Sequence, residues 1–195
     1  MMQNKKIAVT GGLGSGKSAF CAILRDMGYP VLSCDDINRE LWEEREYRAS
    51  LARTFPQCLT DGDIDKKKLA GVVFSDEQAR EALNALAHPA IMKRLHARMN
   101  EQTGTVFCEV PLLFEGGYES AFDAVIALRR NREARIAAVA ERDGMVRGEA
   151  LRRMEKQFDP ALLEQKKCII IENDGDLASL RKKAVDALQT LRLRS

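Results

Sequence analysis

The sequence of 195 residues predicts a three-layer α/β domain built on a parallel sheet. Short apolar runs rich in β-branched residues alternate along the chain with segments of helical periodicity. The first run leads through a glycine-rich turn into a helix, and the second run follows that helix after a single turn. This order makes a β-α-β unit, which implies a right-handed crossover and parallel strands.

Five strands are expected, at 7–9, 31–32, 105–110, 125–128 and 168–173. Each is a short apolar segment of the kind that is buried in a parallel sheet. Ligands of such sheets bind beyond the carboxyl ends of the strands. Gly11, Asp35, Pro111 and Arg129 follow strand ends, so they mark the edge where a site is expected.

Helices are expected to fill the intervals between the strands. The first has apolar residues at helical spacing and a glycine stop at Gly28. The region from about 37 to 100 is polar and helical, with a loop over 57–69 that turns at 61–63 and a helix that continues on both sides of Pro89. Apolar residues at three- and four-residue intervals predict an amphipathic helix over 177–191.

Composition and charge narrow the function classes. The chain has 31 basic and 29 acidic residues, and a net charge of +2 does not argue for a nucleic-acid partner. No apolar stretch approaches membrane-spanning length and no signal segment precedes the first strand, so we expect a cytoplasmic protein. The five cysteines are dispersed without a C-x-x-C pair and are expected to be reduced thiols, while the oligomeric state is left open.

The spacing G-x-x-x-x-G-K-S at 11–18 is typical of a phosphate-binding loop. Its glycines let the backbone pass close to an anion, and the following helix N-terminus adds partial positive charge. Lys17 is expected to reach the β- and γ-phosphates, and the Ser18 hydroxyl is expected to bind Mg²⁺. The loop indicates nucleoside triphosphate binding, but alone it does not separate a motor, a switch, a kinase or a synthetase.

Asp35 and Asp36 follow the second strand directly. Phosphoryl transfer to an alcohol needs a base near the proton of the acceptor hydroxyl, and Asp35 fits that role. Asp36 fits the N-cap of the helix that begins in this segment. The dipeptide alone supports equally well the interpretation that both are caps or solvated carboxylates. Glu109 lies at the end of the third strand. Its position supports equally well a role in positioning Mg²⁺ and a structural role.

An arginine-rich segment follows the fourth strand. It has no lysine, and its arginines lie at 129, 130, 132, 135, 142, 147, 152 and 153. Arginine suits bidentate phosphate contacts, so this segment predicts a helical lid that closes on a polyphosphate and excludes water. We expect two or three of the arginines in the site and the others in solvent. An RNA-binding face is a weaker alternative, because no aromatic residues interleave the charges.

Several segments, taken in order, resemble the dephospho-coenzyme A kinase family. They are VTGGLGSGKS from Val9, VLSCDDINRE from Val31, LNALAHPAI from Leu83, CEVPLLFEGGYESAFD from Cys108, ERDG from Glu141, RRMEKQ from Arg152 and IIIENDGDL from Ile169. The likeness covers almost the whole chain. Only the phosphate loop is generic, and the other segments together are specific.

The resemblance implies a P-loop kinase fold like that of nucleoside monophosphate kinases, with a five-stranded parallel sheet. The core would comprise 1–36, 101–130 and 165–195, with a helical substrate-binding insert at about 37–100 and a lid at about 131–164. It also implies ATP-dependent phosphorylation of the ribose 3′-hydroxyl of dephospho-CoA, the last step of coenzyme A synthesis.

The resemblance assigns roles residue by residue. The catalytic residues would be Asp35 as base, Lys17 and Arg142. ATP would be bound by Gly12, Gly14, Ser15, Gly16, Lys17, Ser18, Ala19, Arg142 and Arg153, with Mg²⁺ on Ser18. The acceptor side would be formed by Asp35, His88, Pro111, Leu112, Leu113 and Glu115. From its position before Pro89 alone, His88 fits packing at a helix kink as well as a substrate contact.

Four positions depart from the pattern of the family. Ser33 replaces the first acid of its D-x-D segment, and Ala19 stands where threonine is frequent. Ala138 stands where an arginine is often found one turn before Arg142, and Cys168 replaces an acid before the last strand. None of these positions is Lys17, Ser18 or Asp35.

Competing functions differ in the motifs they need. A switch GTPase needs an N-K-x-D guanine motif, and ENDGD at 172–176 is not one. A motor ATPase normally shows an apolar run that ends in aspartate, and TVFCEV at 105–110 matches this poorly. Another kinase of the same fold, acting on a nucleoside, a nucleotide or a shikimate-like alcohol, is set aside only by the family resemblance.

Overall fold

The computed structural model describes residues 5–193 of the chain. The chain divides into two compact units, which are described separately. The first unit comprises 1–32 and 101–195, and the second comprises 33–100. Among residues 5–193, the helices lack the combination of length and apolar character that a membrane span requires.

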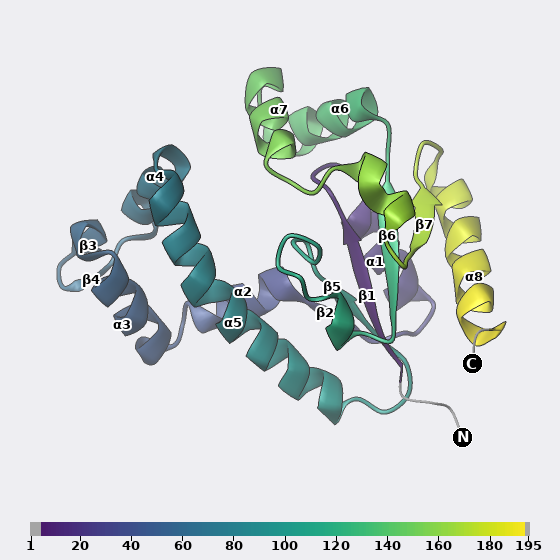
Figure 1. Ribbon diagram of the computed structural model, residues 1–195, viewed down its shortest axis with the longest axis horizontal. Helices are drawn as coiled ribbons and strands as arrows, with labels where there is room; N and C mark the ends of the chain where they lie inside the picture. The colour runs from purple at the N-terminus through teal and green to yellow at the C-terminus, as the bar shows by residue number, and fades with distance from the viewer. Residues whose placement is uncertain (1–4, 194–195) are drawn as a thin grey trace. The chain divides into compact units, whose positions relative to one another are not determined.

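The first unit is built on a five-stranded parallel sheet with the strand order β2-β5-β1-β6-β7 (Figure 1). The strands are β1 (Lys6–Gly11), β2 (Val31–Ser33), β5 (Val106–Glu109), β6 (Ala124–Arg129) and β7 (Ile169–Glu172). Each lies where the sequence predicted a strand. Ile7 of the central strand β1 pairs in register with Phe107 on one side and Ala124 on the other. The predicted α/β class and parallel sheet are confirmed.

Two helices, α1 (Lys17–Asp26) and α8 (Leu177–Leu193), pack against each other and against the sheet. Phe20, Leu24 and Leu180 join strand residues such as Phe107 and Ile126 in one buried cluster. Full burial of each large side chain contributes roughly 1.5–3 kcal/mol. The helix α1 reaches its predicted stop at Gly28, where φ is 85°. This core supports the strand ends that carry the phosphate loop.

The arginine-rich segment forms two helices, α6 (Arg132–Asp143) and α7 (Arg147–Glu155), which lie next to each other in Figure 1. The side chain of Asn131 caps α6 by accepting a 2.9 Å hydrogen bond from the Glu133 amide. Between α7 and β7 the chain passes through the short 3₁₀ helix η3 (Pro160–Gln165). A small apolar cluster holds the pair together: its buried members are Ile136, Val139, Met145 and Ala150, and Leu13 of the phosphate loop packs against them.

The second unit is mostly helical, as predicted. Its helices are α2 (Cys34–Leu41), α3 (Arg45–Thr54), α4 (Lys66–Ser75) and α5 (Glu77–Glu101), with the 3₁₀ turn η1 (Pro56–Cys58). Helix α5 continues on both sides of Pro89, as expected. The segment predicted to be a loop instead contains a two-stranded hairpin, β3 (Leu59–Thr60) and β4 (Asp63–Ile64). Asp61 and Gly62 make its turn with φ values of 51° and 83°.

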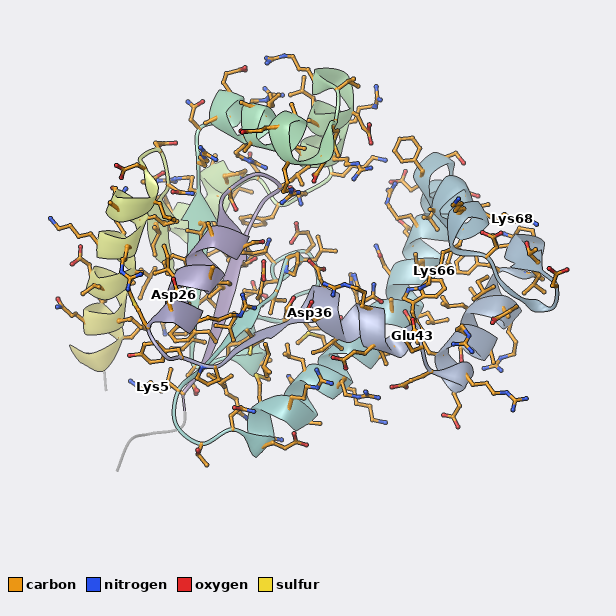
Figure 2. All side chains as sticks on the ribbon, turned by 180° about the vertical axis from the view of Figure 1, so that it is seen from behind. Lys5, Asp26, Asp36, Glu43, Lys66 and Lys68 are labelled. Atoms are coloured by element: carbon orange, nitrogen blue, oxygen red, sulfur yellow. The ribbon has the colours of Figure 1, made fainter. Side chains whose placement is uncertain are left out.

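The start of α2 differs from the prediction. Ser33, at the end of β2, is the N-cap, and its hydroxyl accepts a 3.4 Å hydrogen bond from the Asp36 amide. The expected N-cap role of Asp36 is therefore wrong, because the chain turns helical directly after Ser33. Asp36 lies in the first turn of α2 (Figure 2), where its carboxylate accepts a 2.5 Å hydrogen bond from Arg39.

Candidate active site

The phosphate loop joins the end of β1 to the start of α1. Gly14 and Gly16 have φ values of 75° and 90°, in the left-handed region that favours glycine. Gly16 is the N-cap of α1, and no side chain caps the helix. The first-turn N–H groups of α1 are therefore available for an anion, which is the arrangement that the sequence predicted.

Close neighbours impose a second requirement for glycine in this loop. A Cβ atom on Gly16 would lie 2.0 Å from the Asn173 amide nitrogen. A Cβ on Gly14 would lie 2.5 Å from the Arg135 carbonyl oxygen, and one on Gly12 would lie 2.5 Å from an Arg135 guanidinium nitrogen. These glycines therefore let other segments of the first unit approach the loop backbone, in addition to any role toward phosphate.

Glu109 is the carboxylate of this site. The Ser18 hydroxyl donates a 3.0 Å hydrogen bond to Glu109 Oε1, and Lys17 Nζ lies 3.7 Å from the same oxygen. Glu109 is 7% exposed, so its charge is partly balanced by Lys17 in a buried setting. The sequence left Glu109 undecided, and the structure brings it together with the two polar residues that end the loop motif.

Beneath the loop, Cys21 is fully buried in the first turns of α1. Burial, and secondly the charge of Glu109, raise the pKa of the Cys21 thiol to about 12. The thiol is therefore protonated at neutral pH and is not a nucleophile. All five cysteines are free, as expected from their spacing.

The donor set suits Mg²⁺ when a nucleotide is present. Mg²⁺ prefers oxygen ligands, keeps several waters, and is usually held by one or two carboxylates together with substrate phosphates. Ser18 and Glu109 offer a hydroxyl and a carboxylate at one place. The described residues contain no group of three or more metal-ligating side chains that would hold an ion without phosphate.

Three residues that the sequence analysis did not assign to the site hold the loop backbone. Asn173 donates a 2.9 Å hydrogen bond to the Ser15 carbonyl oxygen. The Leu13 amide donates to Gln157 Oε1 at 2.7 Å, and Arg135 Nε donates to the Leu13 carbonyl oxygen at 2.8 Å. Gln157 and Asn173 lie in segments that carry the family resemblance, which is a signal that could have found them. No sequence signal distinguished Arg135 from the other seven arginines of its segment.

The segment after β5 lies beside the loop. A pocket in the first unit is lined by Gly11 and Gly12 together with Pro111, Glu115 and Phe158. Glu115 Oε1 accepts a 2.8 Å hydrogen bond from the Phe158 amide. Leu113 is fully buried and Leu112 is half-buried, so Leu113 would shape an acceptor site through packing.

The two lid arginines assigned by resemblance have acidic neighbours in their own helices. Arg142 donates two hydrogen bonds of 2.7 Å to Asp143, and Arg153 donates one of 2.8 Å to Glu149. The bond to Asp143 raises the pKa of Arg142, and the same bond lowers the pKa of Asp143. Exposed pairs of this kind contribute little to stability, so phosphate can displace the carboxylates at small cost.

Asp35 and His88 belong to the second unit. Asp35 is exposed in the first turn of α2, two residues beyond β2. His88 is half-buried in α5, one residue before Pro89. Their approach to the phosphate loop stays a prediction, as do the roles of Ala19 and the acceptor-side residues.

A family model described as dephospho-CoA kinase matches residues 5–179. The chain belongs to the dephospho-CoA kinase family. The dephospho-CoA kinase of Thermus thermophilus is 35% identical over 177 residues, which cover 90% of this chain and 86% of that protein. The family resemblance drawn from the sequence segments is thereby confirmed, and the switch GTPase and motor ATPase alternatives are removed.

Solved structures agree with this membership of the dephospho-CoA kinase family. A crystal structure of a Thermus thermophilus protein has a TM-score of 0.84 and 34% identity, covering 95% of this chain and 96% of the other. The dephospho-CoA kinase from Campylobacter jejuni has a TM-score of 0.70 and 27% identity, covering 97% and 98%. The P-loop kinase fold is confirmed, and ATP is the phosphate donor that a kinase of this family uses.

Proposed function

We propose that this kinase transfers the γ-phosphoryl group of ATP to the ribose 3′-hydroxyl of dephospho-CoA, giving ADP and coenzyme A. The observation that carries the proposal is the meeting of Ser18, Lys17 and Glu109 at the end of an uncapped phosphate loop, in a chain that matches the dephospho-CoA kinase family model over 5–179. The loop supplies the phosphate site and the family supplies the acceptor.

The loop residues would bind and orient the polyphosphate. The N–H groups of Gly14, Gly16 and the first turn of α1 would face the phosphates, and Lys17 would balance the negative charge on the β- and γ-phosphates. Ser18 and Glu109 would hold Mg²⁺, which neutralises phosphate charge when bound. Arg142 and Arg153 would exchange Asp143 and Glu149 for phosphate oxygens as the lid closes.

On the acceptor side, Asp35 would accept the proton of the 3′-hydroxyl as its oxygen attacks the γ-phosphorus. The bond from that phosphorus to the β,γ-bridging oxygen breaks, and ADP leaves with the electron pair. His88, Pro111, Leu112, Leu113 and Glu115 would shape the acceptor site. The free cysteines and the use of ATP fit a reaction in the cytoplasm on a small molecule, without nucleic acid.

The deciding experiment incubates purified protein with ATP, Mg²⁺ and dephospho-CoA and measures coenzyme A by mass spectrometry. A panel of nucleoside monophosphates, a nucleoside and shikimate runs beside it, with a reaction that has no acceptor. We expect coenzyme A to form and the other acceptors to remain unmodified. Transfer to another acceptor with no coenzyme A formed would replace the substrate assignment while leaving the fold and the loop unchanged.

A further inference from the structure

Arg135 is a buried charged residue of the first unit, and the proposed reaction does not yet use its charge. It lies in the first turns of α6, is 6% exposed and has its backbone against Gly14. Its Nε donates a 2.8 Å hydrogen bond to the Leu13 carbonyl oxygen. Its guanidinium group also lies against Gly12, where a Cβ would come within 2.5 Å of Nη2.

Among the residues that the structure describes, no acidic residue forms an ion pair with Arg135. Five other arginines of the same segment form ion pairs: Arg129 with Glu172, Arg132 with Glu155, Arg142 with Asp143, Arg147 with Glu133 and Arg153 with Glu149. Arg135 forms none with residues 5–193, although it is the most buried of these six. Burial, and secondly the charge of Arg132, lower its pKa. A buried cation without a counter-ion is costly, and an anion bound nearby would offset that cost.

The sequence near Arg135 lacks an arginine that the family often has. Ala138 stands where the family often has an arginine, and it lies three residues further along α6. Residues three apart on a helix are neighbours on one face, so a long side chain from 135 can serve the region that a side chain from 138 would serve. Arg135 thus places a positive charge three residues before the family position, on the helix that packs against the phosphate loop.

We propose that Arg135 binds the phosphates of ATP and fixes the loop at Leu13, replacing the arginine that is absent at position 138. The guanidinium has several donors, so one can hold the Leu13 carbonyl while others face phosphate oxygens. This inference rests on the ATP-binding half of the proposed function and not on the identity of the acceptor. It can therefore be tested without dephospho-CoA.

The test compares nucleotide binding by isothermal titration calorimetry in the wild type and three variants. Arg135→Gln keeps an N–H donor for Leu13 but removes the charge. Arg135→Gln with Ala138→Arg returns a cation to the family position. Arg132→Gln is the matched control, because Arg132 is exposed on the same helix and lies 3.8 Å from Glu155. Each is titrated with ATP, ADP and AMP, and thermal unfolding checks that each is folded.

For Arg135→Gln we expect ATP binding to weaken by roughly 10–100-fold, ADP less and AMP least, since the loss follows the phosphate charge. We expect Arg132→Gln to stay within about twofold and the double variant to recover part of the loss. Unchanged ATP affinity, or equal losses for ATP, ADP and AMP, would overturn the inference and leave Arg135 a structural residue. If the double variant binds ATP no better than Arg135→Gln alone, the claim that Arg135 replaces an arginine at position 138 is overturned. A wild type that binds no ATP would overturn the proposed function itself.

Discussion

The Ser18 hydroxyl donates a 3.0 Å hydrogen bond to the Glu109 carboxylate, joining the end of the phosphate-loop motif to the end of β5. The two residues are 91 positions apart in the sequence. Only the parallel pairing of β1 with β5 brings them together, because it aligns the carboxyl ends of the two strands. The carboxylate charge is therefore placed beside Lys17 and Ser18, where the proposed function puts Mg²⁺ and the phosphates of ATP.

This contact leads to a prediction for Glu109→Gln. The amide keeps the size of the side chain and can still bond Ser18, but it lacks the negative charge beside Lys17. We expect kcat to fall by about 10–100-fold and more Mg²⁺ to be needed for half-maximal rate. Steady-state kinetics over a Mg²⁺ titration measures both. A normal kcat and Mg²⁺ requirement would show that Glu109 is structural.

Asp35 is predicted to be the base, and Asp36 provides the matched control one residue away. Asp35→Asn should lower kcat by about 100-fold or more while ATP affinity is retained. Asp36→Asn should leave kcat within about twofold, because Asp36 is occupied with Arg39 on the surface of α2. Turnover with dephospho-CoA and ATP titrations separate the two effects. Near-normal turnover of the Asp35 variant would end the assignment.

Gly16 and Gly28 have similar φ values of 90° and 85°, but their surroundings differ. A Cβ at Gly28 meets nothing within 4 Å, whereas one at Gly16 would overlap Asn173. We expect Gly28→Ala to lower the free energy of unfolding by about 1–2 kcal/mol through backbone strain alone. Gly16→Ala should lower the free energy of unfolding by at least about 1 kcal/mol more than Gly28→Ala does. The new Cβ forces the Asn173 side chain to move, and its hydrogen bond to the Ser15 carbonyl oxygen is lost. Urea denaturation measures both, and equal losses would contradict the packing argument.

Ser33 caps α2 where the family pattern has an acid. Ser33→Ala should lower the free energy of unfolding by about 1 kcal/mol, because the Asp36 amide loses its acceptor. Ser33→Asp should remain within about 0.5 kcal/mol of the wild type, since aspartate caps a helix about as well as serine. Chemical denaturation checks both variants. An alanine variant as stable as the wild type would show that the 3.4 Å bond contributes nothing.

The raised pKa of Cys21 leads us to expect a lower free energy of unfolding at alkaline pH. Its pKa is about 12 in the folded protein against an ordinary value of 9.0. Below pH 9 both states hold the proton and stability is unaffected; between pH 9 and pH 12 only the unfolded state loses it. The free energy of unfolding should therefore fall by roughly 1.4 kcal/mol per pH unit in that range. Cys21→Ala should show a shallower decline in denaturation curves at pH 8 to 10.5, and parallel curves would refute the shift.

Much of the fold could be predicted because its signals are local. The strands of a parallel sheet are buried on both faces, so each appears as a short apolar run in the sequence. The loop spacing from Gly11 to Ser18 and the stop at Gly28 depend on backbone conformations that glycine adopts easily. The hairpin at 59–64 was missed, because strands of two residues have no periodicity to detect. The start of α2 was misplaced because serine and aspartate are both good N-caps.

Local patterns in the sequence were thus sufficient to predict the fold class, the phosphate loop and the kinase family. The side chains that hold the loop from distant parts of the sequence became apparent only from the folded chain. Arg135, Gln157 and Asn173 reach it from 122, 144 and 158 residues away along the chain. Such contacts depend on how strands and helices pack, and a local pattern cannot specify them. Packing likewise leaves the buried charge of Arg135 without an acidic partner among the described residues, beside the loop that is expected to hold ATP.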